Sequence, residues 1–380
     1  MNDLLPGGST GATVDESINT SVDADPSASA SAQERLRLRR GADLESLPRG
    51  AGPPPVTGVI RRHPEDFIVE EQLAFPLTGA GEHLYLRIRK TGQNTRWVAK
   101  QLARTLSLSF KAVGFAGLKD RHAITDQWFS LHLPGQADPE LAALGIEGVE
   151  VREAVRHSSK LRTGALSGNR FRIVVRDIEG DLDALEARLG RLHDTPVPNY
   201  FGAQRFGRDA GNLDLLFAAG SDGSPGRGIG REARSFGLSA HRSALFNLWL
   251  AGRIDDGTWR TPLDGEIIYL EDEHRYRHVD KLDAAQPCVP TGLLWGPGDN
   301  QATGTALARE QAFRTNFATT YQLLCEYDVR MMRRPLWLRP ADFDYELDRA
   351  VGASLLKLQF GLTRGQFATA VIREICRHTG

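Results

Sequence analysis

Asp120 is the residue of this sequence whose type and surroundings point most directly to chemistry. It is the single acid among nine basic residues between Arg87 and Arg121, and its immediate neighbours are Lys119 and Arg121. Adjacent cations favour the charged form of a carboxyl group. A carboxylate held in that form is suited to act as a nucleophile or as an electrostatic stabiliser. The structural alternative is a turn aspartate that pairs with Arg121.

A second basic stretch and aromatic residues interleaved in both stretches indicate an anionic partner that also carries planar groups, such as nucleic-acid bases. Residues 156–176 contain six basic residues and no acid, and Trp97, Phe110, Phe115 and Phe171 lie within the two stretches. Phosphate contacts combined with base stacking on aromatic rings are typical of nucleic-acid binding. The alternative is that the forty Arg and seven Lys residues only solvate a surface. We interpret the two stretches together as a nucleic-acid-binding surface.

The composition of the 380 residues argues against several other classes of protein. No run approaches the ~18 consecutive apolar residues of a membrane-spanning helix, and no secretory signal is recognisable. The three cysteines are far apart and odd in number, which suits a reducing cytoplasm. The histidines lack the spacing of zinc ligands, and no glycine-rich phosphate loop is present. Neither a metal nor a nucleotide cofactor is therefore expected.

The elements that must position Asp120 are predicted to be strands with a helix beside them. Residues 112–116 and 127–133 read as strands that enter and leave its loop. Residues 83–89 alternate apolar and polar side chains, as a half-buried strand does, and residues 169–176 alternate again. Thr95 is suited to cap the start of a helix between these strands. The pattern predicts an α+β fold: a largely antiparallel sheet flanked by helices.

The chain is long for a single domain, and we expect one domain to be inserted into another. Residues 51–194 and 342–380 are assigned to the first domain and residues 195–341 to an inserted α+β domain. Residues 1–50 are expected to be a disordered tail, whose deletion leaves folding intact, because they lack aromatic residues and have almost no periodic apolar pattern. A short helix from about Gln33 to Arg40 is the alternative for part of this segment. The first 34 residues hold six acids and no Lys or Arg, which leaves the remainder a net charge of +5. Helices in the inserted domain are expected at 239–253 and 307–324.

Several long motifs, in order along the chain, resemble the tRNA pseudouridine synthase D family. The segment A-G-L-K-D-R-H-A-I-T followed by Q-W-F-S (116–130) resembles the signature around the family's catalytic aspartate, and N-Y-F-G-A-Q-R-F-G (199–207) resembles a second family element. Residues 161–171, 242–253 and 365–374 resemble three further elements. The resemblance covers residues 53–380. Two positions depart from the family pattern without removing a group that the chemistry needs, and these are Ala165 and Thr363.

The resemblance implies an isomerase that converts uridine to pseudouridine at position 13 of tRNA. It implies a pseudouridine-synthase-type catalytic domain, with residues 195–341 as the family's inserted TRUD domain and the RNA in the cleft between the two. The enzyme is expected to need no cofactor and to act as a cytoplasmic monomer. The target base leaves its stack to reach the nucleophile.

The same resemblance assigns roles to individual side chains. Asp120 matches the nucleophile. Positions that contact the target uridine are matched by Phe67, Asn169 and Phe367. Lys119 and Phe171 are expected beside them, with Phe171 placed to stack on the base.

Two rival functions remain open at this point. One is a tRNA-binding chaperone on the same scaffold that performs no catalysis. The other is a hydrolase that uses Asp120, although such enzymes generally need a second carboxylate, which this loop lacks. For the isomerase itself, attack at C6, attack at C1′ and a glycal route are all compatible with the sequence.

Overall fold

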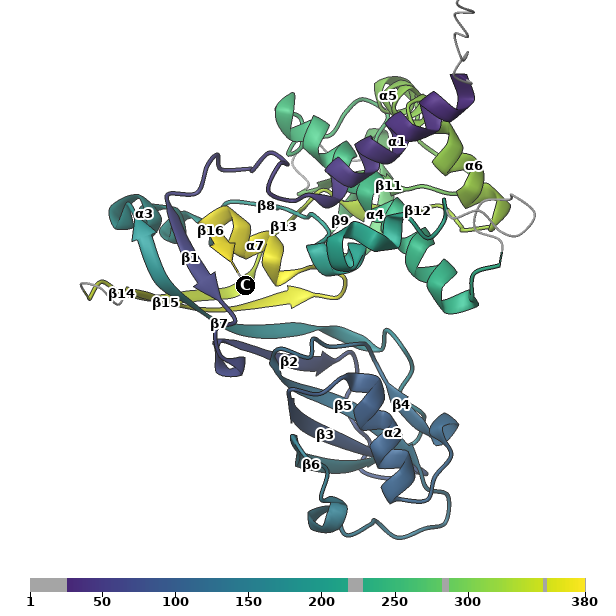
Figure 1. Cartoon of the computed structure of the whole chain (residues 1–380), viewed down its shortest axis with the longest axis vertical. Coiled ribbons are helices and arrows are strands. Elements are labelled where there is room, and N and C mark those ends of the chain that lie inside the picture. Colours follow the sequence, from purple (N-terminus) through teal and green to yellow (C-terminus); the bar gives the residue numbers. More distant parts are fainter. Residues whose placement is uncertain (1–25, 218–227, 282–286, 351–353, 380) are drawn as a thin grey trace, which may run out of the picture.

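A computed structural model describes residues 26–217, 228–281, 287–350 and 354–379. The molecule has a large sheet with its own helices and, beside it, a second group of helices around a small sheet (Figure 1). The fold is mixed α+β, and within the described residues no helix is long and apolar enough to cross a membrane.

The large sheet contains ten strands among the described residues, and most of its neighbours are antiparallel. Its main order is β14-β15-β7-β2-β5-β3-β6, with β1, β4 and β16 paired at its sides. The β2–β5 and β1–β16 pairs are parallel. The strands are β1 (Val56–Ile60), β2 (Phe67–Leu73), β3 (His83–Thr91), β4 (Val113–Phe115), β5 (Ile124–His132), β6 (Val149–His157), β7 (Leu166–Gly180), β14 (Ala341–Asp348), β15 (Leu355–Thr363) and β16 (Cys376–Thr379).

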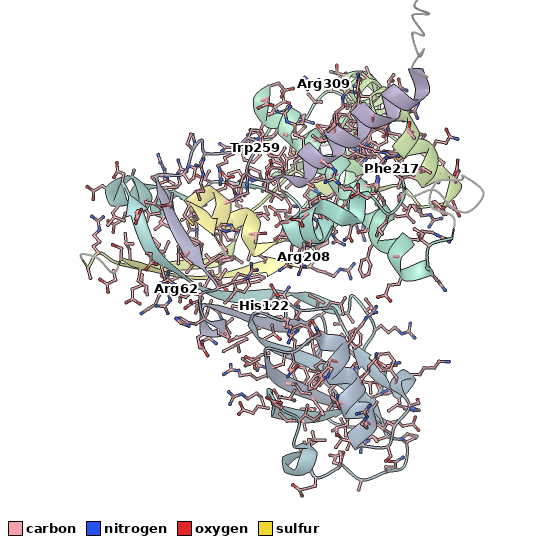
Figure 2. The ribbon with its side chains drawn as sticks, in the orientation of Figure 1. Arg62, His122, Arg208, Phe217, Trp259 and Arg309 are labelled. Carbon is pink, nitrogen blue, oxygen red and sulfur yellow. The ribbon has the colours of Figure 1, made fainter. Side chains whose placement is uncertain are left out.

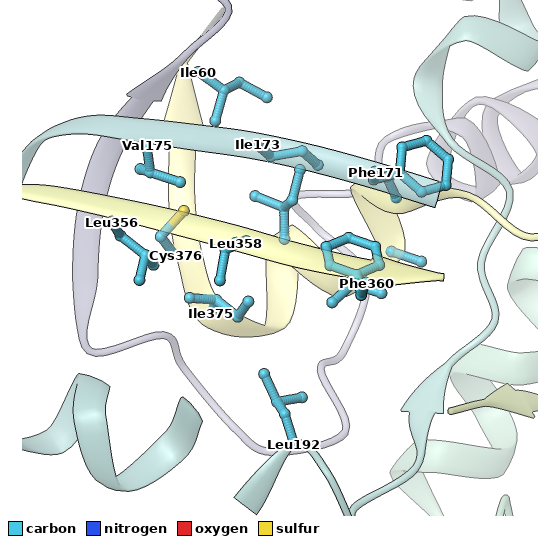
Figure 3. Packing of buried hydrophobic residues seen from close by; sticks show 14 of the residues in the cluster. Ile60, Phe171, Ile173, Val175, Leu192, Leu356, Leu358, Phe360, Ile375 and Cys376 are labelled. Atoms are coloured by element: carbon cyan, nitrogen blue, oxygen red, sulfur yellow. The ribbon is translucent and has the colours of Figure 1, made fainter. Parts of the chain in front are cut away.

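The long strand β7 joins the two halves of this sheet, because it pairs with β2 on one side and with β15 on the other. Helices α3 (Leu182–Arg191) and α7 (Ala368–Ile375) cover the half built from β1, β7, β15 and β16. Alternate residues of β7 point into this core, where Phe171 and Ile173 meet Phe360 of β15 and Ile375 of α7 (Figure 3). Helix α2 (Thr95–Thr105) packs on the other half.

The inserted domain is built around the long helix α4 (Arg231–Asp255). The chain enters it through β8 (Val197–Pro198) and leaves it through β13 (Trp337–Leu338), and these two strands pair with each other. Entry and exit are thereby held together by backbone hydrogen bonds. Its other elements are β9 (Ile267–Leu270), β10 (Arg275–His278), β11 (Val289–Leu294), β12 (Met332–Pro335), α5 (Gly304–Thr315) and α6 (Ala318–Glu326). Short 3-10 turns complete the chain: η1 (Pro64–Asp66), η2 (Phe110–Ala112), η3 (Leu141–Leu144), η4 (Ala203–Phe206), η5 (Arg208–Leu213) and η6 (Val279–Lys281).

Two predicted helices of the inserted domain have different bounds in the structure. The single helix expected at 307–324 is two helices, because Phe317 has non-helical backbone angles and its ring is buried. Helix α4 begins eight residues before the expected cap Ser239, whose hydroxyl instead accepts a hydrogen bond from Arg205. Thr95 is likewise not a cap: Asn94 holds that position without a side-chain bond, and Thr95 is buried.

The expectation that residues 1–50 are disordered is wrong for the part that the structure describes; residues 1–25 lie outside it. Helix α1 (Pro26–Ala42) packs against α4, with Leu38 and Ala42 buried in the core of the inserted domain. Its buried Glu34 accepts hydrogen bonds from the first amides of α6. The buried side chains Glu34, Leu38 and Ala42 therefore hold α1 against the inserted domain, although the average composition of residues 1–50 is that of a disordered segment.

Candidate active site

Asp120 lies in the loop between β4 and β5, and its carboxylate is held by donors from three places in the chain. Its Oδ1 accepts from the backbone N of His122 at 3.1 Å, and its Oδ2 accepts from Nε2 of Gln204 at 2.6 Å. A guanidinium nitrogen of Arg61 is 3.3 Å from Oδ2. Arg121 turns away and donates to the carbonyl of Gly92 at 3.0 Å. The alternative of a turn aspartate paired with Arg121 is therefore wrong.

Arg61 is a site residue that sequence reasoning missed. Its backbone is left-handed, with φ of 56°, at the end of β1, and its guanidinium lies 4.3 Å from the centre of the Phe67 ring. Burial lowers the pKa of Arg61, and the charge of Asp120 opposes this shift. One cation thus contacts both the carboxylate and an aromatic wall of the site. In the sequence, the only indication that Arg61 belongs to the site is that it lies six residues before Phe67, a predicted site residue.

The backbone of Asp120 is fixed by a buried ammonium group. Lys90 of β3 is fully buried and donates from Nζ to the carbonyl oxygen of Asp120 at 2.8 Å. Burial lowers the pKa of Lys90 to about 8, against the raising effect of Asp120. The sequence placed Lys90 among exposed phosphate-binding cations, whereas the structure places it beneath the loop.

A chain of buried polar groups holds the residues just before Asp120. The hydroxyl of Thr95 accepts from the backbone N of Lys119 at 2.9 Å and donates to Oε1 of Gln127 at 3.0 Å. The amide of Gln127 in turn donates to the carbonyl of Gly117 at 2.5 Å. The start of α2 and the middle of β5 thereby fix the loop, which keeps the carboxylate in one position.

Lys119 points toward Asn169 rather than toward solvent. Its Nζ donates to Oδ1 of Asn169 and lies 3.2 Å from Oε2 of Glu71. Glu71 is buried, which raises its pKa, and the charge of Lys119 opposes that shift. Glu71 was not found from the sequence, because nothing local links β2 to the loop. The ion pair orients both Lys119 and the amide of Asn169.

Aromatic rings enclose the space next to the carboxylate. Phe67 meets Phe171 edge-on, with ring centres 6.2 Å apart, and Phe171 stacks on Phe360 at 5.6 Å. Phe367, at the start of α7, packs against Phe201 of the inserted domain, with the two ring centres 5.7 Å apart. Aromatic pairs of this kind present rigid apolar surfaces on which a base can stack.

A cavity of about 160 Å³ brings all six sequence-predicted site residues together. The structure therefore places the six residues together, while the catalytic or binding role of each one stays a prediction. The cavity is also bordered by Arg61 and Gln204, so both domains contribute to it. The six predicted residues in its wall are Phe67, Lys119, Asp120, Asn169, Phe171 and Phe367.

Arg334 of β12, another residue that the sequence did not reveal, ties the inserted domain to the loop that carries Phe367. It donates to the carbonyl of Gly365 at 2.7 Å and to the carbonyl of Asn199 at 3.1 Å. Its guanidinium lies 4.1 Å from the centre of the Phe201 ring. Burial lowers the pKa of Arg334 to about 9. Within the described residues, no cluster of His, Cys, Asp and Glu side chains has the arrangement of a metal site.

Comparison with known proteins gives consistent matches. A family model described as tRNA pseudouridine synthase D (TruD) matches residues 50–216 and 228–375. A tRNA pseudouridine synthase D of Methylococcus capsulatus is 44% identical over 339 residues, which is 87% of this chain and 94% of that protein. One from Nitrosococcus oceani is 40% identical over 344 residues, covering 88% and 95% of the two chains. A solved structure from Methanosarcina mazei, assigned to tRNA pseudouridine synthase D, has a similar fold, with a TM-score of 0.65, 22% identity and coverage of 86% and 95%.

Proposed function

The chain belongs to the tRNA pseudouridine synthase D family and isomerises uridine to pseudouridine in tRNA, and we propose that its target is the uridine at position 13. The family match includes every residue of the cavity around Asp120. The catalytic domain is of the pseudouridine-synthase type, and residues 195–341 form the inserted TRUD domain. The enzyme acts on tRNA as a monomer in the cytoplasm.

Asp120 is the nucleophile in this proposal. It is the only carboxylate among the described residues that line the cavity, and two side chains aim it inward. In the reaction the C1′–N1 bond of uridine breaks and a C1′–C5 bond forms, while C5 loses a proton and N1 gains one. Atoms and electrons balance within the nucleoside, so the reaction requires neither a redox partner nor a cofactor.

The side chains around Asp120 position the base and orient the carboxylate. Arg61 and Gln204 both bind Oδ2, which leaves the second lone pair of Oδ1 for the substrate. The uridine enters after flipping out of its stack, at a cost of a few kcal/mol that stacking on Phe67 and Phe171 partly offsets. The amide of Asn169, oriented by Lys119, is placed to bind the polar edge of the uracil.

The observation that carries the proposal is the isolated carboxylate held by donors from both domains. The test is position-specific mapping of pseudouridine in tRNA incubated with the wild type, Asp120→Asn and the exposed control Asp344→Asn. We expect modification at position 13 by the wild type and the control and none by Asp120→Asn. Asp120→Asn is expected to bind tRNA at least as tightly as the wild type, because it removes an anion near phosphates. Turnover by Asp120→Asn would refute the nucleophile, and a wild type that modifies another position would refute the target.

A further inference from the structure

A second cavity, of about 490 Å³, lies in the inserted domain next to the active site. Its volume is in the range of pockets that hold small organic ligands. Within the described residues its wall contains no Asp or Glu. Instead four guanidinium groups converge on it, and they belong to Arg205, Arg231, Arg234 and Arg242.

The wall of this cavity is largely one face of α4. Arg231, Arg234, Leu238 and Arg242 follow one another at spacings of three or four residues, which places them on the same side of a helix. Ser235, Ser239 and Ser243 add hydroxyl groups to that face. The pattern of cations and hydroxyls is therefore built into the helix and is not an accident of one loop.

Among the described residues, no carboxylate balances these four cations. Among the residues that the structure describes, none of the four arginines lies within ion-pairing distance of an Asp or Glu. Arg205 donates to the hydroxyl of Ser239 at 2.9 Å, and Arg242 donates to two carbonyls. The Nε atoms of Arg234 and Arg242 are buried and have no hydrogen-bond partner within the described part of the chain. Burial lowers the pKa of Arg205 and lowers that of Arg242 to about 10. A bound anion would relieve both the repulsion and the desolvation.

The rest of the wall suits a flat apolar group. Phe201, Leu238, Leu294 and Val329 line it, and the guanidinium of Arg234 lies 5.0 Å from the centre of the Tyr327 ring. Proteins that bind single-stranded RNA stack splayed bases on aromatic rings and guanidinium planes and hold the phosphate with arginines. Apolar walls and cations around one cavity therefore favour a nucleoside phosphate.

The position of the cavity relative to Asp120 indicates where that nucleotide comes from. Gln204, which binds Asp120, and Arg205, which lines the second cavity, are consecutive residues of η4. The Arg205 guanidinium is 5.8 Å from the ring centre of Phe367, which lines the first cavity.

The start of α4 also faces the catalytic domain. Glu232 forms an ion pair with Arg96 of α2. In the view of Figure 2, Arg208 of the inserted domain and His122 of the catalytic domain lie on the two sides of the junction between the domains. An RNA strand whose uridine reaches Asp120 therefore passes the mouth of the second cavity.

We propose that this cavity binds a second nucleotide of the tRNA, a near neighbour of the target uridine that also leaves its stack. Its phosphate contacts the arginines of α4, and its base lies against Leu238 and Tyr327. This inference rests on the proposed function, because it takes tRNA as the substrate. Two extruded nucleotides, held on either side of η4, fix the register that presents one particular uridine to Asp120.

The test uses variants that remove one cation each. Arg231 is exposed, and Arg234 is half-buried and donates to the carbonyl of Ile229 near the start of its own helix, so Arg231→Gln and Arg234→Gln are expected to fold. Arg40→Gln, on an exposed position of α1, is the matched control. We measure the affinity for tRNA as a function of salt concentration. Each cavity variant should raise the dissociation constant about tenfold and reduce the slope of log K against log salt by about one. Arg40→Gln should change neither quantity.

A second measurement identifies the nucleotide. tRNAs with a single abasic site at each of the three positions on either side of the target are bound to the wild type and to Arg234→Gln. At one position the abasic site should weaken binding to the wild type but add little to the Arg234→Gln defect, because a nucleotide whose phosphate is no longer held does not dock its base either. Additive losses at every position, or salt slopes equal to that of Arg40→Gln, would overturn the proposal.

Two controls separate this inference from its premises. Free UMP and ATP are titrated against the wild type and Arg234→Gln. Binding that depends on Arg234 and does not compete with tRNA would show a site for a free nucleotide, and the proposal would be wrong. Pseudouridine formation is assayed in parallel. If the wild type forms no pseudouridine at position 13, the proposed function fails; if it does and the variants bind normally, only the second site fails.

Discussion

Leu38 and Leu36 lie two residues apart on α1, yet one is fully buried and the other is 68% exposed. This pair tests whether α1 is part of the folded inserted domain. Leu38→Ala removes buried methyl groups from the core that also contains Phe246 and Leu250 of α4. Large-to-small changes at such positions cost about 2–5 kcal/mol. Leu36→Ala, the matched control, should change the free energy of unfolding by less than about 0.5 kcal/mol.

Glu34 gives the same helix an electrostatic anchor. Its Oε1 accepts from the backbone N of Thr320 at 2.6 Å and its Oε2 from that of Thr319 at 3.2 Å. These amides belong to the first turn of α6, where a carboxylate also interacts favourably with the helix dipole. Removal of the acceptor by Glu34→Ala leaves a buried amide unpaired, at a cost of about 1–3 kcal/mol.

The assay is thermal unfolding of the full chain and of the three variants, together with single-turnover isomerisation. At about 2–4 °C per kcal/mol for a domain of this size, Leu38→Ala should lower Tm by about 4–20 °C. No residue of α1 lines either cavity, so the rate with saturating tRNA should be unchanged where the variants are folded. Equal Tm values for Leu38→Ala and Leu36→Ala would refute the docked helix and restore the expectation of a tail.

Two further predictions concern the groups that hold Asp120. Gln204→Leu removes the 2.6 Å donor to the carboxylate and should slow single-turnover isomerisation about 10–150-fold, the equivalent of one charge-assisted hydrogen bond; a rate within twofold of the wild type would contradict this role. The pKa of Lys90 is lowered from 10.5 to about 8, so between these values the unfolded chain binds a proton that the folded chain does not, and stability from this group rises with pH. Urea unfolding from pH 8 to 10 should show the wild type gaining stability relative to Lys90→Met, and a constant difference would contradict the buried charge.

The resemblance to family motifs identified site residues that lie on regular elements, and sequence reasoning missed side chains that reach the site through tertiary structure. The family motifs named Phe67, Asn169 and Phe171, and the structure places them on the paired strands β2 and β7. Gln204 approaches Asp120 from 84 residues away along the chain. Arg61 reaches it through a left-handed backbone that no pattern of residue types announces.

Charge counting overestimated the cations available to RNA. Several basic residues of the two stretches are paired within the protein: Arg89 with Asp126, Arg96 with Glu232, Arg156 with Asp138, Arg172 with Glu70 and Arg176 with Asp66. Their acidic partners lie outside the stretches or in the gap between them, so a count within each stretch could not include them. Four arginines that have no acidic partner among the described residues line one cavity of the inserted domain, where the sequence had suggested only a helix.

The inserted domain contributes side chains to the candidate active site. Gln204 supplies a donor to Asp120, and Arg334 fixes the loop that carries Phe367. Both residues lie close to the β8–β13 ladder, which closes the insertion at its base. A movement of this domain relative to the large sheet would therefore change the hydrogen bonding of the carboxylate and the position of an aromatic wall together. Because the same η4 turn also carries Arg205, the proposed binding of a nucleotide beside Arg205 would be coupled to the orientation of Asp120 through Gln204.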